Sequence, residues 1–167
     1  MNFVSKQPIN KGWSRDKKYC VTDENGKRYL LRVSDIAEYD KKQSEFNMMK
    51  QVLALGVPMC QPIEFGVCNE GVYSIQSWID GADAEESIPI LSDTEQYVYG
   101  LEAGRILKKI HSIPAPATQE DWEIRFNCKM DYKIKKYTDC PLKYENGQAF
   151  INYITENCYS LQNRPKN

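Results

Sequence analysis

The dipeptide Asn25-Gly26 lies between two stretches that favour β-strands, and it constrains the fold of this chain more than any other feature. A two-residue type I′ turn needs positive φ angles at both central positions, which asparagine and glycine tolerate well. Counting outward from such a turn pairs Val21 with Leu30. Because side chains alternate between the two faces of a strand, Val21, Leu30 and Arg32 are predicted to share one face of a hairpin.

This predicted face combines two branched aliphatic side chains with a cation, and a loop that contains Gly12 and Ser14 precedes it. Aliphatic side chains can hold a flat base, while a cation and a small-residue loop can hold a phosphate. The same pattern also fits an ordinary surface hairpin, and the hairpin alone does not choose between the two interpretations.

The composition excludes several classes of function. The net charge is −1 with 27% charged residues, so the chain lacks the basic surface expected of a nucleic-acid-binding protein. No apolar run has the length of a membrane span, and the N-terminus lacks the apolar core of a signal peptide, so we expect a cytoplasmic protein without a membrane partner. Six cysteines without a Cys-x-x-Cys pair, and a single histidine, do not predict a metal site.

The order of predicted elements indicates an α+β fold. Strands are expected at 3–9, on both sides of the Asn25-Gly26 turn, and in a second hairpin over 61–79, with a helix over 36–53. These elements would form a five-stranded antiparallel sheet with one helix after the third strand. A capping box at 92–95, the prolines after His111 and further helical patterns beyond residue 118 predict a helical second half.

Several motifs in this order resemble the aminoglycoside phosphotransferase family, antibiotic kinases with a protein-kinase-like fold. The motifs correspond to a phosphate loop, a third strand, the helix after it, a hinge and a helix end. They are residues 12–19, 29–32, 45–49, 74–81 and 107–113. The resemblance implies a protein-kinase-like small lobe over 1–79, which would bind nucleotide, and the hinge and helices of an incomplete larger lobe over 80–167.

The resemblance assigns roles to residues of the sheet and its helix. Val21 and Leu30 would sandwich the adenine, and Arg32 would hold the α- and β-phosphates where most kinases have lysine. Glu45 on the helix would pair with that cation. Arginine is bulkier than lysine and binds bidentately, so the nucleotide could be placed differently in detail.

Four further residues would complete the nucleotide site. Ser14 would cover the β-phosphate, Gln76 would guard the back of the pocket, and the backbone of Ser77 and Ile79 would bond the purine edge. The expected ligand is ATP or GTP with magnesium.

The catalytic half of such a kinase is not found in the sequence. The family carries a His-Gly-Asp loop that binds the acceptor hydroxyl and metal, but the single histidine, His111, is followed by Ser112. We therefore expect an N-terminal portion of a kinase, without catalytic or metal-binding residues, that binds nucleotide but does not phosphorylate an antibiotic or similar small molecule alone.

Three alternatives remain open from the sequence. The chain could be a non-catalytic nucleotide-binding or adaptor module, or part of a choline- or fructosamine-kinase-like enzyme. The acidic stretch 80–86 could attract a cationic antibiotic or form a solvated turn. The tyrosine-rich helices beyond residue 118 could line an acceptor pocket, or they could expose apolar patches and make the chain self-associate.

Overall fold

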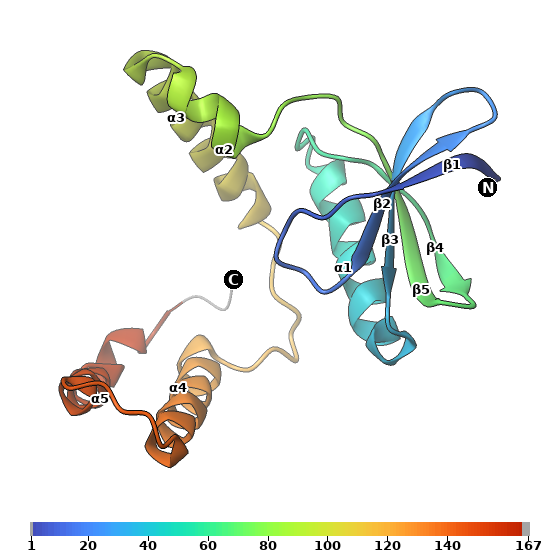
Figure 1. The fold of residues 1–167 in the computed structure, drawn as a ribbon. Coiled ribbons are helices and arrows are strands. Elements are labelled where there is room, and N and C mark those ends of the chain that lie inside the picture. The colour runs from blue at the N-terminus through green and yellow to red at the C-terminus, as the bar shows by residue number, and fades with distance from the viewer. Residues whose placement is uncertain (1, 165–167) are drawn as a thin grey trace. The chain divides into compact units, whose positions relative to one another are not determined.

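The computed structural model describes residues 2–164 and divides the chain into two compact units, Met1–Ile110 and His111–Asn167. The first unit holds the sheet and the second holds two helices (Figure 1). The predicted functional boundary between residues 79 and 80 lies elsewhere, inside the first unit, and remains a prediction. Each unit is described by itself.

The first unit is built on a five-stranded antiparallel sheet in the order β1-β2-β3-β5-β4, which confirms the predicted α+β architecture. The strands are β1 (Phe3–Pro8), β2 (Lys17–Asp23), β3 (Arg28–Ser34), β4 (Pro62–Cys68) and β5 (Gly71–Ser77). Helix α1 (Tyr39–Ala54) follows β3 after a short 3-10 helix, Ile36–Glu38, whose first turn is capped by the side chain of Asp35.

The turn between β2 and β3 differs from the prediction. Asp23 donates its N–H to the carbonyl of Lys27 at 3.0 Å, which closes a loop of Glu24, Asn25 and Gly26. In this loop Gly26 has a positive φ of 77° and Asn25 does not, so the turn is not type I′. It has the form of a type I turn followed by a left-handed glycine.

This longer loop shifts the pairing of β2 and β3 by one residue. Val21 lies opposite Tyr29, and Cys20 lies opposite Leu30. Successive side chains of a strand point to opposite faces of the sheet. A shift of one residue therefore changes which side chains of the two strands share a face. The prediction that Val21 shares a face with Leu30 and Arg32 was therefore wrong.

The two faces of the sheet differ in chemistry. The face away from α1 buries a cluster of Val21, Tyr29 and Ile75, against which further aromatic and aliphatic side chains pack. On the opposite face, the buried Phe46 of α1 packs against Phe65 of β4, and their ring centroids are 5.5 Å apart. The sheet thus has one side centred on a buried apolar cluster and a second side where α1 meets polar residues.

The first unit ends in helical segments after β5. They are α2 (Ala84–Ser87), a 3-10 helix (Ile88–Ile90) and α3 (Asp93–Ile110). The predicted capping box is confirmed, since the N–H of Ser92 donates to Glu95 Oε2 at 2.9 Å and the N–H of Glu95 donates to Ser92 Oγ at 3.4 Å.

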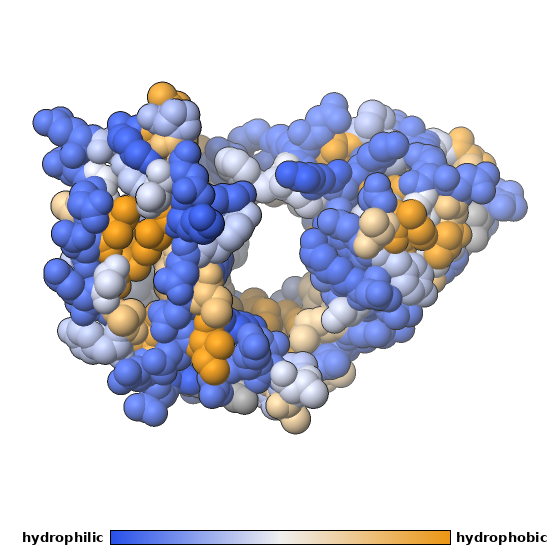
Figure 2. Space-filling view, turned by 90° about the horizontal axis from the view of Figure 1, so that it is seen from below, coloured by the Kyte–Doolittle hydropathy of each residue, from blue (hydrophilic) through white to orange (hydrophobic). Residues whose placement is uncertain are grey.

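The second unit contains α4 (Trp122–Asp139), α5 (Gly147–Glu156) and a 3-10 helix (Cys158–Leu161). An apolar groove of about 250 Å³ lies between α4 and α5, lined by Met130, Tyr137, Phe150 and Ile154 among others. Hydrophobic residues reach the surface in both units (Figure 2). Among residues 2–164, no helix is long and apolar enough to cross a membrane.

Candidate functional site

The face of the sheet beside α1 carries the polar and charged side chains that could bind a ligand. In β3, Leu30 lies opposite Gln76 of β5, and Arg32 lies opposite Ser74. Cys20 of β2 lies opposite Leu30 and completes this face on the other side. An aliphatic side chain, a thiol, an amide and a guanidinium therefore share one surface.

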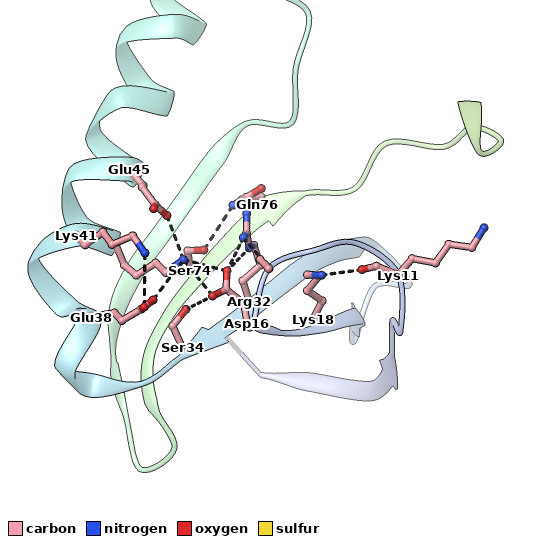
Figure 3. Close-up of polar contacts among 12 residues, drawn as sticks. Lys11, Asp16, Lys18, Arg32, Ser34, Glu38, Lys41, Glu45, Ser74 and Gln76 are labelled. Atoms are coloured by element: carbon pink, nitrogen blue, oxygen red, sulfur yellow. Dashed lines mark hydrogen bonds and ion pairs between the residues drawn. The ribbon is translucent and has the colours of Figure 1, made fainter. Parts of the chain in front are cut away.

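Arg32 is held by Asp16, which lies one residue before β2 (Figure 3). The Nε of Arg32 donates to Asp16 Oδ2 at 3.1 Å, and Nη2 of Arg32 donates to the same oxygen. Nη2 also lies 3.4 Å from Ser14 Oγ. The Nη1 group has no hydrogen-bond partner among residues 2–164, so one edge of the guanidinium remains available to an anion.

Lys42 of α1 is a second cation on the same carboxylate. Its Nζ lies 3.0 Å from Oδ1 and 3.1 Å from Oδ2 of Asp16, and it also donates to Glu45 Oε2 at 3.2 Å. In residues 2–164 Glu45 makes its ion pair with Lys42 and none with Arg32. The predicted pairing of Arg32 with Glu45 was therefore wrong, because Arg32 pairs with Asp16 and Glu45 pairs with Lys42.

The Asp16 carboxylate is the centre of this cluster, with a side chain only 4% exposed. Burial raises its pKa, but hydrogen bonds from Lys42, Ser34 and Arg32 outweigh that effect and bring the pKa down to about 2. Burial lowers the pKa of Lys42, and its bonds to Asp16 and Glu45 reverse the effect and raise it. Asp16 and Lys42 are thus both charged at neutral pH.

The loop between β1 and β2 borders a polar hollow of about 310 Å³ that includes Lys11, Ser14, Asp16 and Lys18 in its lining. Gly12 in this loop has a φ of 94°, which favours glycine, and Lys18 Nζ donates to the carbonyl of Lys11 at 2.6 Å. Lys18 lies opposite Arg32 in the β2–β3 pairing, so its side chain is on the same face as the guanidinium.

Carboxylates of the segment after β5 pair with cations of the sheet and loop. Lys11 Nζ lies 2.6 Å from Asp83 Oδ2 and 3.2 Å from Glu86 Oε1, and Arg28 pairs with Asp80. Three of the four acidic side chains between residues 80 and 86 therefore pair with two cations of this chain. These pairs leave less negative charge to attract a cationic ligand.

The buried amide of Gln76 lies on the same face, opposite Leu30. Its Oε1 accepts from Cys60 Sγ at 3.2 Å, and its Nε2 lies 3.5 Å from Ser74 Oγ. Burial raises the pKa of the Cys60 thiol, which keeps the proton that this hydrogen bond needs. Gln76 is thereby fixed in orientation.

The predicted hinge covers the end of β5 and the residues that follow it. The N–H of Ser77 donates to the carbonyl of Gln61 at 2.9 Å, while Ser77 Oγ accepts from the N–H of Gln61 at 2.8 Å. The N–H of Ser77 is therefore already bonded within the first unit. The side chain of Ile79 is exposed, and its N–H has no hydrogen-bond partner in the described part of the chain.

The structure places Ser14, Leu30, Arg32 and Gln76 close together, as expected from the sequence. Val21 does not belong to this group, because it is buried on the other face of the sheet. The sequence-based prediction missed Asp16, Lys18 and Cys20. The motif Ser14 to Tyr19 pointed to a phosphate loop, but only the true register assigns Lys18 and Cys20 to the face.

Lys42 was also missed. Its position three residues before Glu45, one helical turn away, was the available signal.

Residues 6–166 match the protein-family model described as APH, phosphotransferase enzyme family. The search of curated proteins gives no match.

Among solved structures, the streptomycin-ATP-APH(2")-IIa ternary complex is 17% identical with a TM-score of 0.62, covering 94% of this chain and 54% of that one. The GDP and kanamycin complex of APH(2")-IIia is 14% identical with a TM-score of 0.61, covering 96% and 54%. The GDP complex of wild-type aminoglycoside 2'-phosphotransferase-IIIa is 14% identical with a TM-score of 0.62, covering 99% and 55%. At these identities the likeness shows a shared fold, and the chain spans about half the length of the matched structures.

Proposed function

Because the chain belongs to the phosphotransferase enzyme family, we propose that it forms the nucleotide-binding part of a small-molecule kinase. The complete enzyme would transfer the γ-phosphoryl group of ATP or GTP to a hydroxyl of an aminoglycoside or a similar compound. The matched structures contain ATP or GDP, and two of them also contain an aminoglycoside, which supports this class of ligand.

The observation that carries the proposal is the shared face of Leu30, Arg32 and Gln76 beside the loop that contains Gly12 and Ser14. A nucleotide on this face would place its base against Leu30, with Cys20 beside it. Its phosphates would meet the free edge of the Arg32 guanidinium. Charge-assisted hydrogen bonds of this kind to phosphate are strong because both partners are ionised.

The hinge would fix the orientation of the base. We propose that the carbonyl of Ser77 and the N–H of Ile79 bond the purine edge, while Gln76 limits the depth of the pocket. Because Cys60 donates to the Gln76 oxygen, the amide presents a fixed shape to the base.

Phosphoryl transfer needs further groups for the metal and the acceptor hydroxyl. No group of three or more His, Cys, Asp or Glu side chains that could hold a metal ion occurs among residues 2–164. We propose that this chain binds and orients nucleotide and that the chemistry requires residues outside the 167.

Titration of the purified chain with ADP, ATP and GTP tests the proposal, with Arg32→Met as the variant and Arg164→Met, outside the site, as its control. We expect Arg32→Met to lower affinity for ADP by about tenfold or more, a typical loss for a charged hydrogen bond to phosphate. Magnesium-dependent turnover of ATP by the same preparation should stay at background. Absence of nucleotide binding would contradict the proposed function.

A non-catalytic nucleotide-binding module would give the same binding result. Reading the gene beyond codon 167 separates the two, since an in-frame His-Gly-Asp favours the kinase.

A further inference from the structure

The cation on β3 is not held by a carboxylate of the neighbouring helix. Asp16, from the loop before β2, contacts Arg32 directly, while Glu45 of α1 contacts Lys42. We infer that Asp16 is the residue that positions Arg32 for a nucleotide phosphate and that Glu45 has only an indirect effect. This inference rests on the proposed function and concerns how its site is organised.

The contact of Asp16 with Arg32 fixes the orientation of the guanidinium. Two of its nitrogens, Nε and Nη2, donate to the same oxygen of Asp16, so the plane of the group is held along one edge. Nη1 has no partner in the described residues and is left facing away from the carboxylate. An arginine held in this way loses less side-chain entropy when a phosphate binds, which favours affinity.

Asp16 is itself fixed by groups from two further elements. Ser34 Oγ of β3 donates to Oδ1 at 2.9 Å, and Lys42 of α1 contacts both oxygens. Its side chain is almost fully buried, so these bonds are shielded from solvent. Removing the carboxylate would leave Arg32 and Lys42 as two neighbouring cations without a common anion.

Glu45 differs from Asp16 in environment. Its side chain is 48% exposed, and its contact with the cluster passes through Lys42. Exposed ion pairs contribute little because water screens them. The helix carboxylate therefore cannot hold Arg32 as firmly as the buried carboxylate of the loop.

The same contact connects Arg32 to the loop. Asp16 lies two residues after Ser14, whose Oγ is 3.4 Å from Arg32 Nη2. Arg32 thus contacts both Ser14 and Asp16 of this loop. Loss of Asp16 would release the loop and the guanidinium together.

The direction in which Asp16→Asn changes the affinity for ADP distinguishes a positioning role of Asp16 from a purely electrostatic one. Asp16→Asn removes a negative charge beside the site, so electrostatics alone predicts tighter binding of an anionic nucleotide. A positioning role predicts weaker binding. It also predicts that only the phosphates are affected, because Asp16 contacts no group that would meet the base.

The experiment measures the affinities of ADP and adenosine for the full chain by calorimetry. We expect Asp16→Asn to weaken ADP binding at least tenfold, about 1.4 kcal/mol, while adenosine binding changes less than twofold. Glu45→Gln should weaken ADP binding two- to threefold. Asp40→Asn, the same substitution at an exposed position of α1, is the matched control and should change neither affinity.

A second variant covers the case in which Asp16→Asn does not fold. Ser34→Ala removes one bond to Asp16 and keeps every charge, and we expect it to weaken ADP binding about threefold with adenosine binding unchanged.

Three results would overturn the inference. Unchanged or tighter ADP binding by Asp16→Asn would show that it does not position Arg32, and an equal loss for ADP and adenosine would show a purely structural role. If the wild-type chain binds neither compound, the proposed function fails and the inference fails with it.

Discussion

The sheet unit and the helical unit of this chain bury their apolar side chains to different extents. The buried hydrophobic residues of the described chain lie in the first unit, with Val21, Tyr29 and Ile75 at the centre of one cluster. In the second unit, Gly147 is the one residue of α4 and α5 that is buried, and large apolar side chains such as Tyr144 and Phe150 are exposed.

This difference follows from how the elements are partnered. A curved five-stranded sheet with a helix on one face can bury residues on both of its faces, whereas two helices with one contact surface leave most of their apolar residues in water. The sheet unit therefore has the packing needed to hold a polar site rigid. The side-chain polar atoms of Asp16 and Gln76 each have at least one hydrogen-bond partner in that unit.

The largest expected effect compares the same substitution in the two units. Ile75 is 2% exposed in the sheet, and Ile154 is 36% exposed on α5. We expect Ile75→Ala to lower the free energy of unfolding by about 3 kcal/mol, because it leaves a cavity in a closed core, and Ile154→Ala by about 1 kcal/mol or less. Urea unfolding followed by circular dichroism measures both. Equal losses of unfolding free energy in the two variants would contradict the stated difference in burial between the two units.

The next effect is the pH dependence of the buried cluster. The pKa of Asp16 is about 2 in the folded chain against an ordinary value of 3.8, so the unfolded chain binds this proton more readily. The stability that the ionised Asp16 side chain adds to the folded chain is fully present above about pH 4, and it is lost as the pH falls through the pKa of Asp16 in the folded state. We expect a loss of about 2 kcal/mol of stability from this group.

The measurement compares unfolding free energies of the wild type and Asp16→Asn at pH 5 and pH 2.5. Other carboxylates titrate in both chains and cancel, so the difference between the chains should shrink at the lower pH. A difference that stays constant would show that Asp16 has no ion pair in the sheet unit.

The smallest expected effect on stability comes from the exposed side of the helical unit. Phe150 is 68% exposed beside the groove between α4 and α5. We expect Phe150→Ser to change the unfolding free energy by about 0.5 kcal/mol or less and to reduce self-association, because exposed apolar patches favour association. Sedimentation of the wild type, Phe150→Ser and the control Val4→Ser over a range of concentrations tests this. A wild-type chain that stays monomeric would contradict the prediction.

The sequence by itself determined the order of the elements and the position of the site along the chain. Alternating apolar residues and glycine-containing turns are local signals, as is the capping box at Ser92, and each was confirmed as an element boundary within a few residues. The motif order also indicated the family and the small-residue loop beside Arg32.

Only the tertiary structure decided which side chains meet at that site. The left-handed Gly26 without a left-handed Asn25 lengthens the turn, and the resulting shift places Cys20 in the position expected for Val21. The partner of Arg32 is equally nonlocal, because Asp16 and Arg32 meet through strand pairing and burial. Turn length and long-range ion pairs depend on the packing of the whole sheet, so local sequence patterns do not contain them.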